Sequence, residues 1–254
     1  MSTVKERYGL HGTPDELNKY RDKPTQFICG VEYEIESIKN HGPCESFVTI
    51  KEDGSLRNNG FEYITRPNSY EESLAIFKRL HDCLTYGEDA FSHRTSIHVH
   101  VNVAHMEMPQ VKQLVLLYAL CEPLFFNFVG KERESSIFCV PLYHTYLASH
   151  YKKSADILVS TWHKYTAFNL CPIPQQGSVE FRHLGGTNDY TRFELWLSSL
   201  KSLYDFVNNN PKMNVLKELK DVPGLVEQAV PKLLSMGSLD LLKDSILDVK
   251  LAGV

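Results

Sequence analysis

The chain has 254 residues, and 43% of them are hydrophobic, which is enough for one large domain or two small ones with a buried core. Its formal net charge is −4, from 27 basic and 31 acidic residues mixed along the chain. This balance argues against global disorder and offers no basic stripe of the kind that binds nucleic acid. We therefore expect no nucleic-acid partner, although one pocket could still take a small anionic ligand.

The sequence shows no segment typical of secretion or of a membrane span. The first 24 residues are polar, and no run approaches the roughly 20 apolar residues that a membrane helix needs. The six cysteines lack CxxC or CxxH spacing, so neither a zinc ribbon nor a redox pair is indicated. We expect a cytoplasmic protein without a membrane partner, with reduced and mostly buried cysteines.

The first part of the chain predicts a β-rich segment. Residues 1–24 have weak periodicity and two prolines, which indicates an irregular arm. Alternating apolar and polar residues then predict strands over 26–37, 46–50 and 60–67. Pro67 ends the last of them because it has no backbone N–H to donate.

Helices become frequent after this segment. Ser69 fits an N-cap with Glu72 three residues later, and apolar residues at helical spacing extend this helix to residue 84. A strand over 95–103 follows. Next comes a long apolar helix over 109–130, in which Pro123 should produce a kink and whose final glycine should end it.

The remaining pattern predicts a helix, a strand and an amphipathic helix, over 152–163, 178–186 and 191–207. A proline-rich loop, CPIPQQG, precedes the strand. The tail predicts two or three short helices that form an appendage to the core. The chain is thus expected to contain an N-terminal arm (1–24), a main domain (25–210) and a helical extension (211–254).

Four strands combine an apolar face with a face that carries ion-binding groups. Side chains two residues apart on a strand lie on one face, so each set should point the same way. The sets are Glu32, Glu34 and Glu36 in GVEYEIE, Glu62 and Arg66 in FEYITR, His98, His100 and Asn102 in IHVHVN, and Glu180 and Arg182 in VEFRHL.

Closely spaced carboxylates favour a cation between them. Same-face neighbours on a strand lie about 7 Å apart, and without a cation each carboxylate disfavours the charge of the next. Oxygen ligands with one or two imidazoles suit Mg²⁺ or Mn²⁺ better than zinc. Arg182, two residues after Glu180, could neutralise phosphate oxygens beside such a cation. The chain has neither GxxxxGK[ST] nor GxGxxG, so a nucleotide would be held on the sheet.

Each strand taken alone has a simpler interpretation. Alternating glutamates usually face solvent, and paired histidines are about as often structural as ligating. Glu180 and Arg182 alone could form an ion pair of little energetic worth. The occurrence of all four strands in one chain is what favours the metal-binding interpretation.

The order of these motifs resembles the amidoligase family, a group of carboxylate-amine ligases with the glutamine synthetase fold. The resemblance runs from about Cys29 to Trp196 and rests on GVEYEIE, DGSL with GFEYITRP, SIHVHVNV, KYTAFNL, VEFRHLGGTND and a tryptophan-bearing helix. It implies an α+β fold, with a glutamine synthetase-like curved antiparallel sheet that bears ligands on its concave face and is packed by helices. It also implies that the main domain uses ATP and Mg²⁺ (or Mn²⁺) to join a carboxylate substrate to an amine substrate through an acyl phosphate.

The resemblance further implies roles for individual residues. The metal ligands would be Glu32, Glu34, Glu62, His98 and Glu180. The nucleotide contacts would be His98, His100, Arg182 and Arg133. The catalytic set would be Arg182, Glu62 and Asp53, the last of which would orient or deprotonate the amine. The residues left without a role are Glu36, Tyr165, Asn169 and His183. Of the two histidines, His98 is expected to be functional, and His100 to lie behind it or towards the substrate.

Two other functions remain open at this stage. A metallohydrolase could use the same sheet to activate water without ATP, and a non-catalytic scaffold could retain the fold. The C-terminal helices could supply a subunit contact or a docking site for another protein. Candidate substrates include amino acids, peptides, a cell-envelope precursor or a protein side chain. Short members of such a family suggest a bacterial or phage source, and a phage protein would act in the host cytoplasm.

Overall fold

The computed structural model describes residues 2–10, 19–20, 23–145 and 147–253. Within these ranges, seven strands form one sheet in the order β3-β4-β1-β7-β9-β8, with β5 paired to β1 outside this path. They are β1 (Ile28–Ile35), β3 (Val48–Glu52), β4 (Phe61–Thr65), β5 (Asn68–Ser69), β7 (Ser96–Asn102), β8 (Phe168–Asn169) and β9 (Ser178–Gly185). A small second sheet pairs β2 (Ile38–Asn40) with β6 (Thr85–Tyr86).

All pairs within the large sheet are antiparallel, and their registers explain how the polar groups come together. Glu34 of β1 lies opposite Glu62 of β4, and His100 of β7 lies opposite Glu180 of β9. Directly opposed residues of an antiparallel pair share a face. The alternation seen in the sequence therefore becomes one continuous polar face across neighbouring strands.

The pairing of β7 with β9 contains a bulge. The register shifts between Ile97 and Val99, so two residues of β9, Arg182 and His183, correspond to one residue of β7. His183 is fully buried, whereas Arg182 keeps partial exposure. Alternation from Glu180 places Arg182 on the polar face and His183 in the core, and the bulge brings Leu184 into the core as well.

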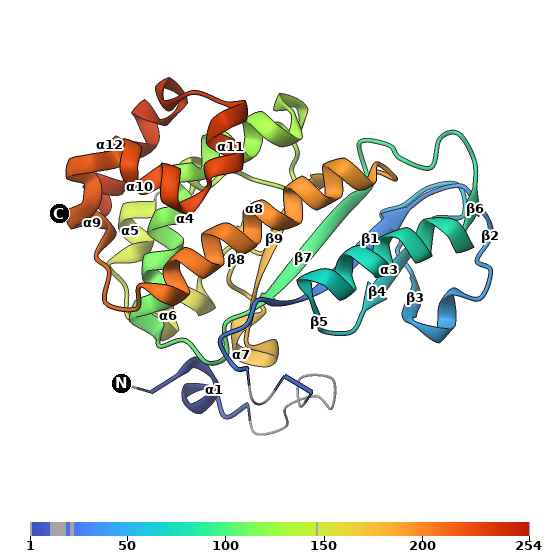
Figure 1. The fold of residues 1–254 in the computed structure, drawn as a ribbon, viewed down its shortest axis with the longest axis horizontal. Coiled ribbons are helices and arrows are strands. Elements are labelled where there is room, and N and C mark those ends of the chain that lie inside the picture. Colours follow the sequence, from blue (N-terminus) through green and yellow to red (C-terminus); the bar gives the residue numbers. More distant parts are fainter. Residues whose placement is uncertain (1, 11–18, 21–22, 146, 254) are drawn as a thin grey trace.

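Three helices cover the apolar face, namely α3 (Tyr70–Cys83), α4 (Met108–Val129) and α8 (Tyr190–Asn209). α3 contacts β1, α4 contacts β9, and α8 packs against both helices, as Figure 1 shows. The capping box that begins α3 is formed by Ser69 and Glu72, as predicted. Phe77 of α3 stacks on Phe193 of α8, with ring centroids 4.4 Å apart.

α4 is the central helix of the core. It ends before Gly130, as predicted, and it continues through Pro123, which does not break it. Among the described residues it is the one helix that is long and apolar enough to cross a membrane. However, 72% of its most apolar 18-residue window is buried inside the protein. Packing in the core therefore accounts for its apolar character.

The helix predicted over residues 152–163 is shorter than expected. Within this range the structure has α6 (Ala155–Ser160), and a separate helix, α5 (Leu147–Tyr151), precedes it. The side chain of Ser154 accepts a hydrogen bond from the N–H of Ile157, which begins a new helix at this point. The loop expected at CPIPQQG also contains a short helix, α7 (Ile173–Gln176), which ends at Gly177 in the left-handed region with φ 67°.

Both ends of the chain pack on the sheet and its helices. In the N-terminal arm, α1 (Val4–Arg7) lies beside the segment that follows β7, where Val4 and Lys5 donate backbone hydrogen bonds to Met106 and Ala104. Part of the arm, residues 1, 11–18 and 21–22, falls outside the described residues. Figure 1 shows α1 beside α7, near one end of the central strands.

The C-terminal helices are α9 (Val215–Glu218), α10 (Val222–Ala229), α11 (Pro231–Met236) and α12 (Lys243–Ala252). Short 3₁₀ helices cover Cys44–Ser46, Lys131–Arg133, Leu142–His144, Leu219–Asp221 and Leu239–Leu242. α12 contacts α4 and α5, and Ser245 donates a hydrogen bond to the backbone oxygen of Leu120. Figure 1 places these helices at the end of the molecule opposite β2 and β6. The division into arm, main domain and extension stays a prediction.

Candidate active site

A cluster of carboxylates and imidazoles lies on the polar face of the central strands. β1 and β7 meet with Glu32 opposite His98, and β7 and β9 meet with His100 opposite Glu180. The structure thus brings together the following residues that the sequence singles out: Glu32, Glu34, Glu62, His98, His100, Glu180 and Arg182.

His98 lies between carboxylates and is almost fully buried. Its Nδ1 lies 3.4 Å from a carboxylate oxygen of Glu32 and 3.4 Å from one of Glu180. Its Nε2 is 2.7 Å from the Ser96 hydroxyl, which donates its single hydrogen to Glu34. Ser96 then accepts from Nε2–H, which leaves Nδ1 as the nitrogen that faces the two carboxylates.

His100 offers a second nitrogen to the same carboxylates. Its Nδ1 lies 3.4 Å from the hydroxyl of Ser178, which donates to the side chain of Gln176. Ser178 therefore accepts from Nδ1–H, and Nε2 is the nitrogen that faces the carboxylates. This Nε2 is 3.3 Å from an oxygen of Glu32, but it has no aligned hydrogen-bond partner among the described residues, although it is buried.

One candidate set of metal-ligand atoms contains His100. One ligand atom each from Glu32, His100 and Glu180 lies within 4.8 Å of the other two. His98 approaches the same carboxylates as closely: its Nδ1 lies 3.4 Å from Glu32 and from Glu180, whereas Nε2 of His100 lies 3.3 and 3.9 Å from them. The expectation that His98 is the functional histidine therefore stays a prediction.

Glu180 and Arg182 are held in fixed positions by their neighbours. Arg182 forms an ion pair with one oxygen of Glu180 and donates from Nε to the backbone oxygen of Phe138 at 3.1 Å. The other oxygen of Glu180 accepts a 2.7 Å hydrogen bond from Asn169. Asn169, which has no role assigned from the sequence, thus orients Glu180. Tyr165 lies nearby, with its ring centroid 5.9 Å from the guanidinium carbon of Arg182.

The charges in the cluster shift one another's pKa values. Burial would raise the pKa of Glu32, but His100 and His98 outweigh burial and hold this pKa well below its ordinary value. Burial would likewise lower the pKa of His100, but Glu32 and Glu180 raise it. Burial, together with the charges of Glu32 and Glu34, raises the pKa of Glu62 to about 7.

These residues fit a divalent metal ion. Several carboxylate oxygens with an imidazole nitrogen form the donor set that Mg²⁺ and Mn²⁺ accept, and imidazole is tolerated better by Mn²⁺. The buried Nε2 of His100 has no aligned hydrogen-bond partner among the described residues and could serve as a ligand atom. Glu62 lies beside this set, and a nearby cation would lower the free-energy cost of ionising its carboxyl group.

Arg133, a predicted nucleotide contact, donates hydrogen bonds to the backbone of β9. Its Nε and one terminal nitrogen donate to the backbone oxygens of His183 and Arg182, at 2.8 and 3.0 Å, and its side chain is buried. The guanidinium therefore supports β9 from behind. These bonds use two of the five N–H donors of the guanidinium, and the nucleotide contact stays a prediction.

Asp53 and Glu36 likewise serve their local turns. Asp53 accepts a 2.8 Å hydrogen bond from the N–H of Ser55, and among the described residues it makes no hydrogen bond or ion pair with the cluster. Glu36 is buried and accepts from the N–H of Arg57, which fixes the loop between β3 and β4. The amine-binding role of Asp53 stays a prediction.

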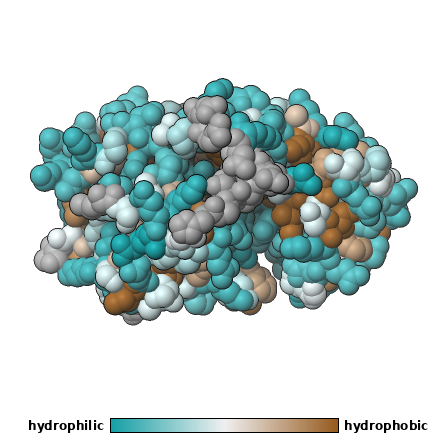
Figure 2. Space-filling model, turned by 90° about the horizontal axis from the view of Figure 1, so that it is seen from below, coloured by the Kyte–Doolittle hydropathy of each residue, from teal (hydrophilic) through white to brown (hydrophobic). Residues whose placement is uncertain are grey.

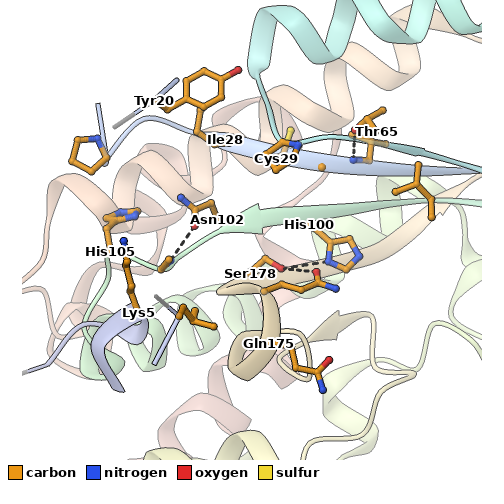
Figure 3. Close-up of a pocket in the computed structure, with 18 of the residues that line it drawn as sticks. Lys5, Tyr20, Ile28, Cys29, Thr65, His100, Asn102, His105, Gln175 and Ser178 are labelled. Atoms are coloured by element: carbon orange, nitrogen blue, oxygen red, sulfur yellow. Dashed lines mark hydrogen bonds between the residues drawn. The ribbon is translucent and has the colours of Figure 1, made fainter. Parts of the chain in front are cut away.

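A cavity of about 730 Å³ opens beside the cluster. Glu32 and His100 line it, together with residues of the N-terminal arm. In Figure 3, His100 and Ser178 lie towards one end, and Lys5 and His105 lie towards the other. Figure 2 shows the face of the molecule that carries the arm as mostly hydrophilic, with hydrophobic residues gathered on the side of β3 and β4.

The sequence patterns did not identify two residues that lie near the cluster. Ser96, which joins His98 to Glu34, falls in the same alternation as the histidines, so its position on the polar face could have been predicted. Lys51 lies opposite Glu62 and lines the cavity. Its strand was predicted to end at residue 50, and no motif marked it.

Comparisons with known proteins place the chain in a family. A family model described as "Putative amidoligase enzyme" matches residues 51–203, which is more than half of the chain and includes β4, β7 and β9. No curated protein matches. Among solved structures, a bifunctional glutathione synthetase from Pasteurella multocida is similar, with 10% identity and a TM-score of 0.41 over 99% of this chain. The alignment covers 51% of that protein, so the chain spans about half its length. The family match confirms the resemblance seen in the motifs, and the chain belongs to the amidoligase family.

Proposed function

We propose that the protein is an ATP- and Mg²⁺-dependent ligase that forms an amide bond between a carboxylate and an amine through an acyl phosphate. The main observation behind this proposal is that Glu32, His100 and Glu180 converge beside Arg182 on one face of the sheet. Membership of the amidoligase family supports amide-bond formation in general. The proposal includes a glutamine synthetase-like arrangement of the antiparallel sheet.

In this proposal, Glu32, His100 and Glu180 hold a metal ion, with Glu34, Glu62 and His98 adjoining it. When bound, the ion would neutralise charge on the phosphate oxygens of the nucleotide. The site needs this help because several carboxylates would otherwise repel a triphosphate.

Arg182 would stabilise the phosphoryl group during its transfer. Its Nε and Nη1 are committed to Phe138 and Glu180, and among the described residues Nη2 has no hydrogen-bond partner. A guanidinium fixed in this way can donate to a phosphate oxygen without first being ordered, which favours the transition state.

The reaction has two steps. An oxygen of the substrate carboxylate attacks the γ-phosphorus of ATP, the bond to ADP breaks, and an acyl phosphate forms. The amine nitrogen then attacks the acyl carbon, phosphate leaves with the bonding electrons, and the nitrogen gives up a proton. Asp53 and Glu62 are the proposed groups that orient the amine and take this proton.

The test is Mg²⁺-dependent release of ADP, measured with panels of acids and amines. Replacing Arg182 by Gln or Glu32 by Gln should lower kcat by about 10²-fold or more, the usual cost of removing an electrostatic group from a transition state. Glu52→Gln is the matched control, because this exposed glutamate of β3 pairs with Phe61 and lies on the other face of the sheet. It should keep full activity.

The alternatives give different results in the same experiments. A metallohydrolase would cleave an ester or amide with Mg²⁺ or Mn²⁺ present and ATP absent. A scaffold would neither bind a nucleotide with Mg²⁺ nor turn over any substrate. Failure of a non-hydrolysable ATP analogue to raise the melting temperature in the presence of Mg²⁺ would count against the ligase.

A further inference from the structure

Two of the six cysteines lie on segments that meet beside an edge strand of the large sheet. Cys44 begins the 3₁₀ helix Cys44–Ser46, which leads into the edge strand β3, and Cys83 is the last residue of α3. Both thiols are free. Cys44 is fully buried, whereas Cys83 is partly exposed.

The small second sheet brings these two segments together. β2 and β6 are antiparallel, and Asn40 of β2 lies opposite Thr85 of β6. The chain that follows β2 and the chain that precedes β6 therefore leave the same end of the pair. The first of these leads to Cys44 and the second contains Cys83. Figure 1 shows β2 and β6 beside one end of α3.

Side-chain contacts hold the 3₁₀ helix against α3. Arg79 donates a hydrogen bond to the hydroxyl of Ser46 at 3.2 Å, and its guanidinium carbon lies 4.0 Å from the ring centroid of Phe47. Cys83 follows one turn after Arg79, and side chains four residues apart on a helix share a face. Cys83 therefore lies on the side of α3 that packs against the segment of Cys44.

The two backbones approach closely next to the cysteines. A Cβ added to Gly42 would lie 2.4 Å from the backbone oxygen of Cys83, and the φ of this glycine is 54°, so a larger residue does not fit. Burial, together with the adjacent thiol of Cys83, raises the pKa of the Cys44 thiol to about 12. The two thiols therefore face each other across a close contact.

We propose that Cys44 and Cys83 form a modification site, at which a low-molecular-weight disulfide oxidises the two thiols to a reversible disulfide bond. This bond would fasten the start of the edge strand β3 to the end of α3. The inference is independent of the proposed ligase function, because neither cysteine belongs to the cluster of carboxylates and imidazoles.

The reaction is a pair of thiol–disulfide exchanges. Cys83 should react first, because its side chain is partly exposed and Cys44 is buried. The Cys83 thiolate attacks one sulfur of the reagent, the S–S bond breaks, and one thiolate leaves. Cys44 then loses its proton and attacks the Cys83 sulfur, which expels the second half of the reagent as a thiolate. The protein gives up two electrons and two protons, and the reagent is reduced to two thiols.

The experiment exposes the folded, full chain to excess oxidised glutathione. Remaining free thiols are then alkylated, and disulfide-linked peptides are mapped by mass spectrometry. We expect a linked pair of peptides that contain Cys44 and Cys83, and an intact protein that has lost the mass of two hydrogen atoms. Dithiothreitol should reverse both changes.

A thermal unfolding measurement tests whether the bond fastens the two elements. A disulfide that closes residues 44–83 into a loop restricts the unfolded chain, so the melting temperature of the oxidised protein should rise by about 5 °C or more. Reduction should return it to its starting value. An unchanged melting temperature would refute the fastening of β3 to α3.

Three variants identify the sulfur atoms. In Cys44→Ala the reaction should stop at a mixed disulfide between Cys83 and glutathione, whereas Cys83→Ala should leave the buried Cys44 unmodified. Cys171→Ala is the matched control, because Cys171 is the other partly exposed cysteine, and this variant should form the bond as before.

The remaining outcomes count against the inference. It is overturned if Cys83 of the unsubstituted protein stays a mixed disulfide, because Cys44 would then be out of reach. It is equally overturned if either cysteine pairs with a different one, if the bonds join two molecules, or if no bond forms in excess reagent. None of these results bears on ADP release, so failure of this inference is distinguishable from failure of the ligase proposal.

Discussion

Glu122 is a buried carboxylate whose ionisation should set part of the pH dependence of stability. It lies in α4 with 1% of its surface exposed. It accepts hydrogen bonds from the N–H of Leu142, at 2.8 and 2.9 Å, and from the hydroxyl of Tyr118 at 2.7 Å. Through these bonds it anchors the loop that supplies the backbone oxygen of Phe138 to Arg182.

The magnitude follows from the pKa of this carboxyl group. Burial raises the pKa of Glu122 from 4.5 to about 7, although hydrogen bonds from Leu142 and Tyr118 oppose the rise. A shift of this size corresponds to about 3 kcal/mol. Between the two pKa values the unfolded chain has released the proton and the folded protein still holds it. The free energy of unfolding should therefore fall by about 3 kcal/mol as the pH rises from about 4.5 to about 7.

The assay compares Glu122→Gln with the unsubstituted protein by denaturant unfolding at several pH values, followed by tryptophan fluorescence. The substitution has its own cost, about 1–3 kcal/mol, because an amide nitrogen would face the N–H of Leu142. That cost does not depend on pH. The difference between the two proteins should therefore shift by about 3 kcal/mol in favour of the variant from pH 4.5 to pH 8. A constant difference would show that Glu122 does not titrate in this range.

Three further predictions concern the metal, a turn and the core. Mg²⁺ or Mn²⁺ at about 100 times its dissociation constant should stabilise the protein by about 2.7 kcal/mol in thermal unfolding, and Glu32→Gln should remove this effect; an equal shift in both proteins would place the ion elsewhere. Gly177→Ala should destabilise by about 1–2 kcal/mol, since φ is 67° and a Cβ would lie 2.9 Å from side-chain carbons, whereas Gly54→Ala meets nothing within 4 Å and should cost less. Tyr118→Phe removes a hydroxyl that bonds two buried side chains and should lower the free energy of unfolding by about 1–3 kcal/mol, measured in urea.

The polar face could be predicted from the sequence because side chains on a strand alternate with a fixed period. Glu32 and Glu34 had to share a face, as did His98 and His100, whatever the order of the strands. The order β3-β4-β1-β7-β9-β8 was not predictable in this way, because it depends on long-range pairing. The bulge in β9, which brings Leu184 into the core next to His183, is likewise set by its partner strand.

The roles of the two histidines could not be separated by pattern alone. Both fall on the polar face, and the difference between them arises from hydroxyl groups on other parts of the sheet. Ser96 takes the Nε2–H of His98, and Ser178 takes the Nδ1–H of His100. Which nitrogen is free for a ligand therefore depends on neighbours that only the fold supplies. The same holds for Arg133, whose backbone acceptors in β9 are 49 and 50 residues away in the chain.

The position of Arg182 shows how the core and the cluster depend on each other. Its guanidinium is held by Glu180, by the backbone oxygen of Phe138 and, through its own backbone, by Arg133. The loop that carries Phe138 is in turn fixed by Glu122 in α4. An arginine that must meet a transferring phosphoryl group gains from such support, because misplacement by about 1 Å can cost 10²-fold in rate. If Arg182 has the proposed role, substitutions at Glu122 should therefore affect kcat through Arg182 even though the carboxylate is buried in the core, and the proposed metal ligands on the sheet should keep their positions.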